Sequence, residues 1–317
     1  MDGQGERPEL VIAGCGYVGS ALARQAMASG WGVTGISHSE ASAARLRDAG
    51  IRAVAADLGD EASLRAVAAA LPAGVLVVHC AASGRGGGVE AYRSVYLGGM
   101  RALRSAFPGA RRLLFTSSTS VYAGIDGAEV TEVSPADPER ETGRILRQTE
   151  DETLAAGGAV VRLAGIYGPG RSVLLLHYLT GQSVIDVRSE PPATPDGRWV
   201  NQIHREDAAA AMLHLLGHPD DAVFRGQVYN ASDGRPMLQR EIYDGLSLRF
   251  GCGLPPESAP DVGRKRGWTH KRVGSARLQA TGWKPRYPGW FAALDGDPEL
   301  VPSILAKLGE GDPGGEG

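Results

Sequence analysis

A run of glycines close to the N-terminus is the first stretch of the sequence that could bind a cofactor. It follows the apolar residues 10–13, precedes a predicted helix at 20–29, and consists of Gly14-Cys15-Gly16-Tyr17-Val18-Gly19. In this context the three glycines allow a tight turn, a close approach of the backbone to a pyrophosphate, and close packing of the helix on a sheet. The N–H groups at the start of the helix would hold the phosphates. We interpret the motif as a nicotinamide dinucleotide site; with 45 glycines in the chain, an ordinary glycine-rich turn is the alternative.

The end of the second predicted strand bears on the choice between NAD(H) and NADP(H). An acid at this place would bind the ribose 2′-hydroxyl of NAD(H) and repel the 2′-phosphate of NADP(H). The chain instead has Ser37 and His38 there, with Arg45 further along, and these side chains suit a phosphate. We therefore expect NADP(H) rather than NAD(H), although Glu40 lies nearby. The third strand ends at two residues that we expect at the adenine edge, Asp57 and Leu58.

Apolar strands alternate with helices through the first half of the chain. Strands are expected at 10–13, 33–36, 53–56, 75–79, 112–116 and 159–163. Helices are expected between them, at 20–29, 41–49, 63–71, 89–107 and 143–156. The strand at 75–79 is apolar without alternation, which is typical of a parallel strand covered on both faces. This pattern predicts an α/β fold, a Rossmann-type doubly wound parallel sheet.

The pattern changes after about residue 168. Helices are expected at 173–179, 206–216 and 238–250, a strand at 228–230, and loops at 189–197 and 255–268. We expect a dinucleotide-binding Rossmann domain at 1–168, and at 169–308 a smaller C-terminal α/β lobe that binds substrate, with some return of the chain to the Rossmann domain. The Gly-, Pro- and acid-rich tail at 309–317 is expected to be disordered.

Composition narrows the class of protein further. The 317 residues are 43% hydrophobic and 22% charged, with a formal net charge of −3, so neither nucleic acid nor a membrane surface is expected as a partner. Three cysteines without a CxxC pair predict neither a disulfide framework nor a metal site. Without a signal-like or membrane-spanning apolar segment, we expect a cytoplasmic protein.

The chain resembles the extended and atypical short-chain dehydrogenase/reductases, in particular the NAD(P)-dependent epimerase/dehydratase-like and nucleoside-diphosphate-sugar epimerase-like atypical group of bacteria. Besides the glycine motif, the resemblance rests on Ala55-Ala56-Asp57-Leu58, His79-Cys80-Ala81-Ala82, Phe115-Thr116-Ser117-Ser118-Thr119-Ser120-Val121-Tyr122, Arg162-Leu163-Ala164-Gly165-Ile166-Tyr167-Gly168-Pro169-Gly170, Ile203-His204-Arg205-Glu206-Asp207 and Gly282-Trp283-Lys284-Pro285-Arg286-Tyr287-Pro288. These stretches follow one another from about residue 10 to 290. They imply that Ala81, Ala82 and Leu163 also contact the cofactor.

The resemblance places Ser118 where a hydroxyl of the superfamily binds the substrate oxygen. Such a hydroxyl can donate to a carbonyl or accept from an alcohol; the alternative is a loop serine that bonds to backbone groups. Extended dehydratases carry acids just after this serine, whereas this chain has Thr119 and Ser120, which argues against a sugar 4,6-dehydratase mechanism.

The catalytic Tyr and Lys of the superfamily are missing. Thr142 takes the Tyr position, Leu146 takes the Lys position, and Tyr96 replaces the usual helix Asn. A Thr hydroxyl cannot replace a phenol as a proton donor near neutral pH. A redox step would therefore need another group, for which the candidates are Tyr96, Tyr122, Tyr167, Arg144 or a water held by Ser118. Thr119, next to Ser118, is also expected among the catalytic residues. His204 precedes a helix start and is expected to cap that helix.

Three functions compete. The first is an NADP(H)-dependent oxidoreductase or epimerase acting on a small polar carbonyl or alcohol, with hydride chemistry supplied by the cofactor. The second is a non-redox enzyme, an isomerase, cyclase, lyase or hydrolase, that reuses the fold. The third is a dinucleotide-sensing protein without catalysis. The only expected partner besides a small substrate is a second copy of the chain, since extended relatives often form homodimers.

Overall fold

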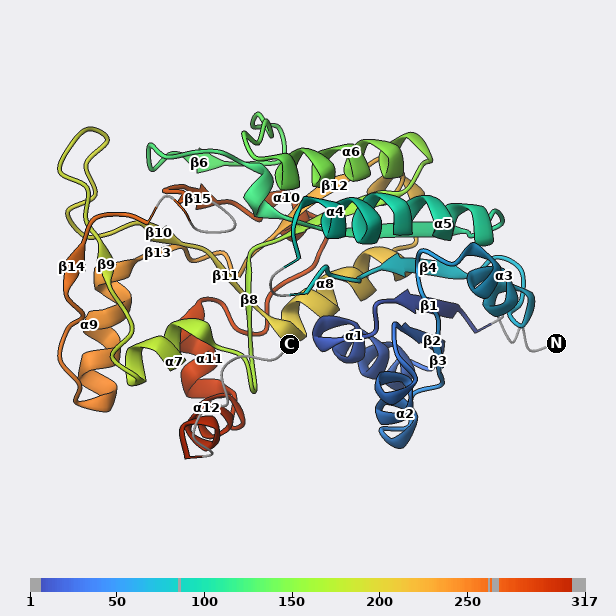
Figure 1. Cartoon of the computed structure of the whole chain (residues 1–317), viewed down its shortest axis with the longest axis horizontal. Helices are drawn as coiled ribbons and strands as arrows, with labels where there is room; N and C mark the ends of the chain where they lie inside the picture. The colour runs from blue at the N-terminus through green and yellow to red at the C-terminus, as the bar shows by residue number, and fades with distance from the viewer. Residues whose placement is uncertain (1–6, 85–86, 262, 264–267, 310–317) are drawn as a thin grey trace.

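A seven-stranded parallel sheet forms the centre of the molecule (Figure 1). The computed structural model describes residues 7–84, 87–261, 263 and 268–309. The strand order is β12-β7-β5-β4-β1-β2-β3, so the chain starts in the middle and builds outward in both directions. The strands are β1 (Glu9–Ala13), β2 (Gly32–Ser37), β3 (Ala53–Ala55), β4 (Leu76–His79), β5 (Arg112–Ser118), β7 (Ala159–Leu163) and β12 (Val228–Ala231). This is the Rossmann-type arrangement that the sequence predicts.

Helices cover both faces of the sheet because the strands are apolar on both sides. Leu10, Ile12 and Val78 point into a core shared with one set of helices, α1 (Tyr17–Ala28), α2 (Glu40–Asp48) and α8 (Arg205–Gly217). Val11 and Val77 point to the other face. That face is covered by α3 (Glu61–Ala69), α4 (Val89–Tyr92), α5 (Gly99–Ala106) and α6 (Glu141–Ala155). In Figure 1, α1 and α2 lie below the sheet, and α4, α5 and α6 lie above it.

Several elements differ from their predicted bounds near the cofactor motif. Helix α1 begins at Tyr17 instead of residue 20, because the amide of Ser20 already donates to the Gly16 carbonyl. Strand β5 extends two residues further than predicted and ends at Ser118. The helix expected at 89–107 is interrupted by a π-helical turn, Arg93–Gly98, between α4 and α5. Each difference moves side chains at the carboxyl edge of the sheet, where open α/β sheets bind ligands.

The second half of the chain contributes to two cores. Strand β12 pairs with β7, and α8 packs on α1, so both return to the Rossmann sheet. The remaining elements surround a separate apolar core that includes Tyr178, Tyr243 and Trp290. They are β8 (Gly165–Tyr167), α7 (Val173–Leu179), β9 (Ile185–Asp186), β10 (Trp199–Val200), β11 (Gln202–His204), β13 (Met237–Leu238), α9 (Gln239–Phe250), β14 (Glu257–Ser258), α11 (Trp290–Gly296) and α12 (Leu300–Gly309). Two short strands, β6 (Glu129–Val130) and β15 (Arg272–Val273), pair with each other, and α10 (Ala276–Ala280) lies next to β12.

The prediction of a loop over residues 255–268 is wrong in part. Glu257 and Ser258 form β14, which pairs in parallel with β9. The partner strand lies about 70 residues earlier in the chain, and so short a strand shows no periodicity from which it could be predicted. Residues 262 and 264–267 of that loop, and 310–317 of the tail, lie outside the described residues. Within the described part of the chain, no helix is long and apolar enough to cross a membrane.

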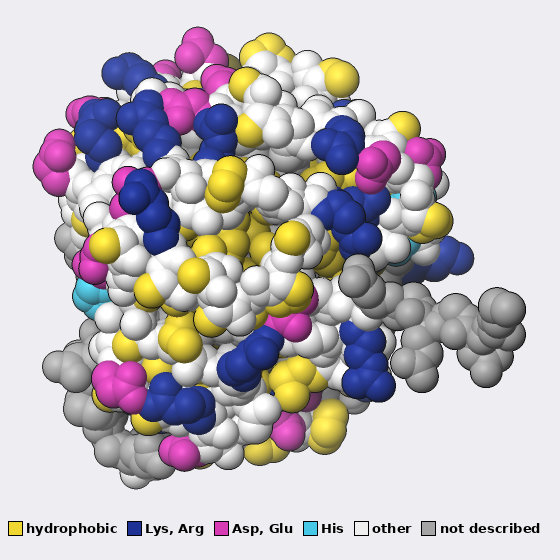
Figure 2. Space-filling view, turned by 90° about the vertical axis from the view of Figure 1, so that its right-hand side faces the viewer, with side chains coloured by type: hydrophobic (Ala, Val, Ile, Leu, Met, Phe, Trp, Pro, Cys, Tyr) yellow, Lys and Arg dark blue, Asp and Glu magenta, His cyan; other side chains and the backbone are white. Residues whose placement is uncertain are grey.

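Charged side chains of both signs are interspersed on the surface. Figure 2 shows Lys and Arg next to Asp and Glu on the face at the right-hand side of Figure 1. Several arginines are paired, among them Arg101, whose Nε lies 2.8 Å from Glu152, and Arg65, which bonds to Glu61 one turn away. The exposed partners make these pairs weak contributors to stability.

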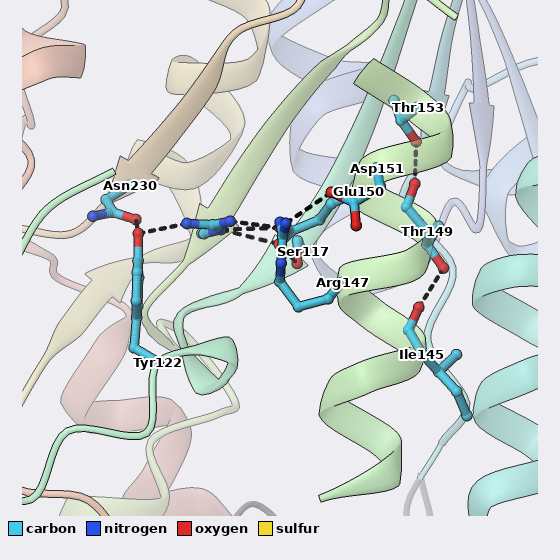
Figure 3. A network of polar contacts seen from close by, with 10 residues as sticks. Ser117, Tyr122, Ile145, Arg147, Thr149, Glu150, Asp151, Thr153 and Asn230 are labelled. Carbon is cyan, nitrogen blue, oxygen red and sulfur yellow. Dashed lines mark hydrogen bonds and ion pairs between the residues drawn. The ribbon is translucent and has the colours of Figure 1, made fainter. Parts of the chain in front are cut away.

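A buried polar network fastens α6 to three strands of the sheet (Figure 3). Glu150 of α6 is fully buried and accepts from Nη2 of Arg162 on β7 at 2.6 Å and from the hydroxyl of Ser117 on β5. Arg162 also donates from Nη1 to the Tyr122 hydroxyl at 2.7 Å, and that hydroxyl donates to Asn230 Oδ1 on β12 at 2.9 Å. Each charge is therefore compensated inside the protein, which is the condition for burying it.

Arg162→Met should destabilise the protein by about 3–5 kcal/mol, because it leaves the Glu150 carboxylate buried without its main cationic partner. Guanidinium unfolding measures this free energy. Arg101→Ala is the matched control: its ion pair with Glu152 is exposed at the surface, so the loss should stay below about 1 kcal/mol. Equal losses in the two variants would contradict the structural role of the buried pair.

Candidate cofactor and substrate cavity

A cavity of about 1040 Å³ opens at the carboxyl ends of the strands. Its walls are formed by the turn after β1, the tips of β2 and β3, the loop after β4, the π-helical turn, and the ends of β5 and β7. The size lies at the upper end of the range typical of ligand pockets. Most of the residues predicted from the sequence line it: Gly14, Gly16, Tyr17, Val18, Ser37, His38, Asp57, Leu58, Ala81, Ala82, Leu163, Ser118 and Tyr96.

The glycine turn is shaped by very close backbone contacts. Gly14 has a φ of +86°, and a Cβ there would lie 2.2 Å from the backbone of Ala81. Gly19 does not line the cavity. A Cβ on Gly19 would lie 2.7 Å from the Gly14 carbonyl oxygen, so only a residue without a side chain lets α1 pack on the turn. Gly16 is different, because a Cβ there would meet nothing within 4 Å. Its backbone faces the open space that a bound pyrophosphate would occupy.

The start of α1 favours an anion. Gly16 is the N-cap residue of α1, so no side chain at this position bonds to the first amides of the helix. The first turn of α1 also contains no acidic residue. The first amides of the helix therefore keep their N–H groups and the partial positive charge of the helix end. Arg24 and Arg171 add two guanidinium groups to the cavity wall. These features fit the diphosphate of a dinucleotide.

The tip of β2 presents polar and basic side chains to the cavity. Arg45 on α2 donates from Nη2 to the Ser42 hydroxyl at 2.9 Å, and both line the wall next to Ser37 and His38. Glu40 bonds to Arg47 and is not among the lining residues. The acid in this part of the wall is Asp57, whose carboxylate accepts from the amide of Gly59 at 2.8 Å.

The opposite end of the cavity carries hydroxyl groups. Ser118 is the last residue of β5, and its Oγ accepts from the amide of Ser120 at 3.2 Å, which leaves its O–H available to donate. Tyr96 reaches the same cavity from the π-helical turn. Leu146, in the position of the superfamily's Lys, also lines the wall and makes it apolar there.

A buried histidine accounts for the π-helical turn. The amide of Gly99 donates to the carbonyl of Ser94, five residues back, so the Val95 carbonyl loses its α-helical donor. His79 Nε2 lies 2.9 Å from that carbonyl and donates to it. Burial lowers the pKa of His79 to about 4, so the ring is neutral. A Cβ on Gly99 would lie 3.0 Å from His79 Nε2, so glycine is needed for the ring to approach.

Three of the predicted catalytic residues lie outside the cavity. Thr119 is buried in the 3₁₀ turn after β5. Arg144 is exposed on α6 and donates from Nη2 to the Glu139 carbonyl at 2.7 Å. Tyr167 lies in the core of the second lobe against Trp290, and burial, followed by the charges of Asp233 and Asp207, raises the pKa of its phenol. The structure thus does not bring these three together with Ser118.

His204 caps a helix, as expected from the sequence. Its Nδ1 accepts from the amide of Glu206 at 3.3 Å at the start of α8, and its Nε2 lies 3.0 Å from Asp297 Oδ2.

The hydroxyl of Tyr122 bonds to Arg162 in the Glu150 network, and Tyr122 does not line the cavity. In the described part of the chain no three His, Cys, Asp or Glu side chains gather as a metal site.

Several cavity residues were not predicted from the sequence. Ser42, Tyr92 and Arg171 line the wall, and His79 shapes it from behind. Arg171 directly follows the Gly168-Pro169-Gly170 stretch. A basic residue next to a family motif is therefore the sequence feature from which Arg171 could have been predicted as a cavity residue. The role of His79 had no local signal, because its partner Val95 lies 16 residues away.

Comparison with known proteins agrees with this geometry. The model of the NAD dependent epimerase/dehydratase family matches residues 10–232, which include the Rossmann sheet except for its first residue, Glu9. The chain belongs to this family. Protein YeeZ of Escherichia coli strain K12 is 29% identical over 289 residues, covering 88% of this chain and 96% of YeeZ. UDP-glucose 4-epimerase of Streptomyces lividans is 27% identical over 305 residues, covering 87% and 91%.

Among solved structures, a conserved protein of unknown function from Silicibacter pomeroyi aligns with a TM-score of 0.68. It is 27% identical, and the alignment covers 92% of this chain and 99% of that protein. The epimerase/dehydratase family is NAD-dependent. This agrees with the open space beside Gly16 and with the start of α1, which has no side-chain cap. The family does not by itself fix the reaction.

Gly16→Ala should weaken dinucleotide binding at least about tenfold while leaving the fold intact, because the added methyl group enters open space beside the helix start. Gly14→Ala is the matched comparison, since its Cβ would collide with Ala81 and its φ is left-handed, so it should lower the thermal stability. Cofactor titration and thermal unfolding separate the two effects. Unchanged binding by Gly16→Ala would remove this turn from the cofactor site.

Proposed function

We propose that the protein is an NADP(H)-dependent oxidoreductase or epimerase that acts on a small polar carbonyl or alcohol without a Tyr–Lys catalytic pair. The observation that carries this proposal is a single cavity that joins the glycine turn to Ser118 and Tyr96. The nicotinamide would supply hydride exchange when bound. The Ser118 hydroxyl would hold the substrate oxygen, and the Tyr96 phenol would hold or move the proton on that oxygen.

The preference for NADP(H) is supported by the charges at the tip of β2. Arg45 and Ser42 lie on the cavity wall where the ribose 2′-position is expected, and Glu40 bonds to Arg47 instead. A guanidinium with a neighbouring hydroxyl is suited to a phosphate group.

A small substrate is supported by the extent of the wall. Most of the described lining residues belong to the Rossmann part of the chain, and Leu146 and Leu163 give the wall an apolar surface. The epimerase of Streptomyces lividans acts, by its name, on UDP-glucose. In this chain, none of the described residues after Arg171 lines the cavity, so a second nucleotide is not part of the proposal.

A non-redox enzyme is the second candidate. Leu146 puts an apolar side chain where the superfamily has its Lys, and this favours chemistry that needs no phenol of lowered pKa. A dinucleotide sensor would share the same cavity and show binding without turnover.

Purified protein should oxidise NADPH in the presence of at least one member of a panel of small polar aldehydes and ketones, followed at the nicotinamide absorbance band. Ser118→Ala should lower kcat/KM about 100-fold with little change in NADPH binding, because the lost hydroxyl contacts the substrate rather than the cofactor. Ser29→Ala is the control, since that hydroxyl is exposed at the end of α1, donates to the Gln25 carbonyl at 3.0 Å and does not line the cavity. Tight binding without turnover on any substrate would favour the sensor, and turnover without nucleotide would favour the non-redox enzyme.

Arg45→Ala should raise the Kd for NADPH about 10- to 100-fold and leave that for NADH within about twofold, because only the 2′-phosphate would lose a charged hydrogen bond. Arg47→Ala on the same helix is the matched control, as its guanidinium bonds to Glu40 outside the cavity. Fluorescence titration with both nucleotides measures the ratio. An equal loss for the two nucleotides would contradict 2′-phosphate recognition by Arg45.

A further inference from the structure

A tight turn at residues 168–171 presents Arg171 to the cofactor cavity. The amide of Gly168 donates to the Arg171 carbonyl and the amide of Arg171 donates to the Gly168 carbonyl, both at 2.9 Å. Between them, the Gly170 amide donates to Ser303 Oγ on α12 at 2.7 Å. The backbone that carries Arg171 is thus fixed by three hydrogen bonds, while its side chain is exposed and lines the cavity.

The same turn is attached to the first residue of α1. The Tyr17 hydroxyl donates to the Pro169 carbonyl at 3.1 Å. The guanidinium groups of Arg171 and Arg205 lie 5.2 Å and 4.9 Å from the centre of the Tyr17 ring, within the range of cation–π attraction. A Cβ on Gly168 would lie 2.8 Å from the Tyr17 hydroxyl, so only glycine lets the turn approach this closely.

Two of the nearby arginines share one carboxylate. Glu206 bonds to Arg205 at 2.8 Å and lies 3.9 Å from Arg24. Arg205 shares the Tyr17 ring but does not line the cavity, whereas Arg171 does. Beside Arg171 lie the uncapped start of α1 and the open space at Gly16. An anion held by the helix amides therefore meets a guanidinium that is already positioned.

We propose that Arg171 completes the binding site for the cofactor diphosphate and thereby ties cofactor binding to the second lobe. This inference rests on the proposed function, because it assumes a dinucleotide in the cavity. The arginine donates to the phosphate oxygens from the side opposite the glycine turn, and a planar guanidinium suits such bidentate contacts. Through Gly170 and Ser303, the same interaction stabilises the position of α12.

The decisive measurement is calorimetric titration of the full chain with ADP-ribose, which has the diphosphate, and with AMP, which has a single phosphate. The 2′-phosphorylated forms of both ligands are titrated in parallel, so that the result does not depend on the choice between NAD(H) and NADP(H). Arg171→Ala should weaken ADP-ribose about 10- to 100-fold, the range for a lost charged hydrogen bond, and change AMP by less than about twofold. Retained AMP binding also shows that the variant is folded.

Arg205→Ala is the matched control, because it removes the other cation from the Tyr17 ring without altering the cavity wall; both ligands should bind as in the wild type. Amide hydrogen exchange at Gly168, Gly170 and residue 171 adds a second readout: ADP-ribose, but not AMP, should slow it in the wild type, and neither should in Arg171→Ala. Unchanged ADP-ribose affinity in Arg171→Ala, or an equal loss for AMP, would overturn the assignment. A wild-type protein that binds neither ligand would instead overturn the proposed function.

Discussion

The contact between the turn after β1 and the chain leaving β4 determines the geometry of the cavity. The two strands are neighbours in the sheet, and the amide of Cys80 donates to the Ala13 carbonyl at 2.7 Å. The chain after β1 must then turn at Gly14 directly against the backbone of Ala81, where no side chain fits. Because the turn is so tight, α1 starts only three residues later, and its first amides face the cavity. The open space beside Gly16 therefore follows from close packing between two backbone segments. The polar side chains of the cavity lie around this space.

The loss of the Tyr–Lys pair is accompanied by a different role for α6. In this chain Leu146 packs with Phe115 and Tyr96 in one apolar cluster, and an amine in its place would have to be desolvated there. The fully buried carboxylate of α6, Glu150, lies one turn further along, where Arg162 and Arg147 compensate its charge. The buried ion pair of Glu150 and Arg162 thus holds α6 on the sheet, and neither of these two residues lines the cavity. The hydroxyl groups of the cavity wall come instead from Ser118 on β5 and from Tyr96 on the π-helical turn, both next to α6.

What the sequence could predict follows from the range of the interactions involved. The glycine motif, the alternation of strands and helices, and the basic tip of β2 are local patterns, and the structure has the sheet and the lining residues that they indicate. The position of Arg171 beside α1 depends on a contact between Tyr17 and Pro169, which are 152 residues apart. The π-helical turn depends on His79 and on the absence of a side chain at Gly99. The parallel pairing of β14 with β9 likewise requires the folded lobe. None of these contacts has a periodicity or a spacing that a sequence pattern could register.

The protonation states of the cavity groups follow from their burial. His79 stays neutral above a pKa of about 4, so its one N–H remains on Nε2, bonded to the Val95 carbonyl, throughout the neutral range. Burial raises the pKa of Tyr17 and of Cys15 to about 12 and that of Cys80 to about 11, so these groups stay protonated over the same range. These four groups therefore keep one protonation state between about pH 5 and 8. A pH dependence of turnover in that interval would therefore have to arise from groups other than these four, such as Lys271 and Asp233, because burial lowers the pKa of Lys271 and raises that of Asp233, each to about 7.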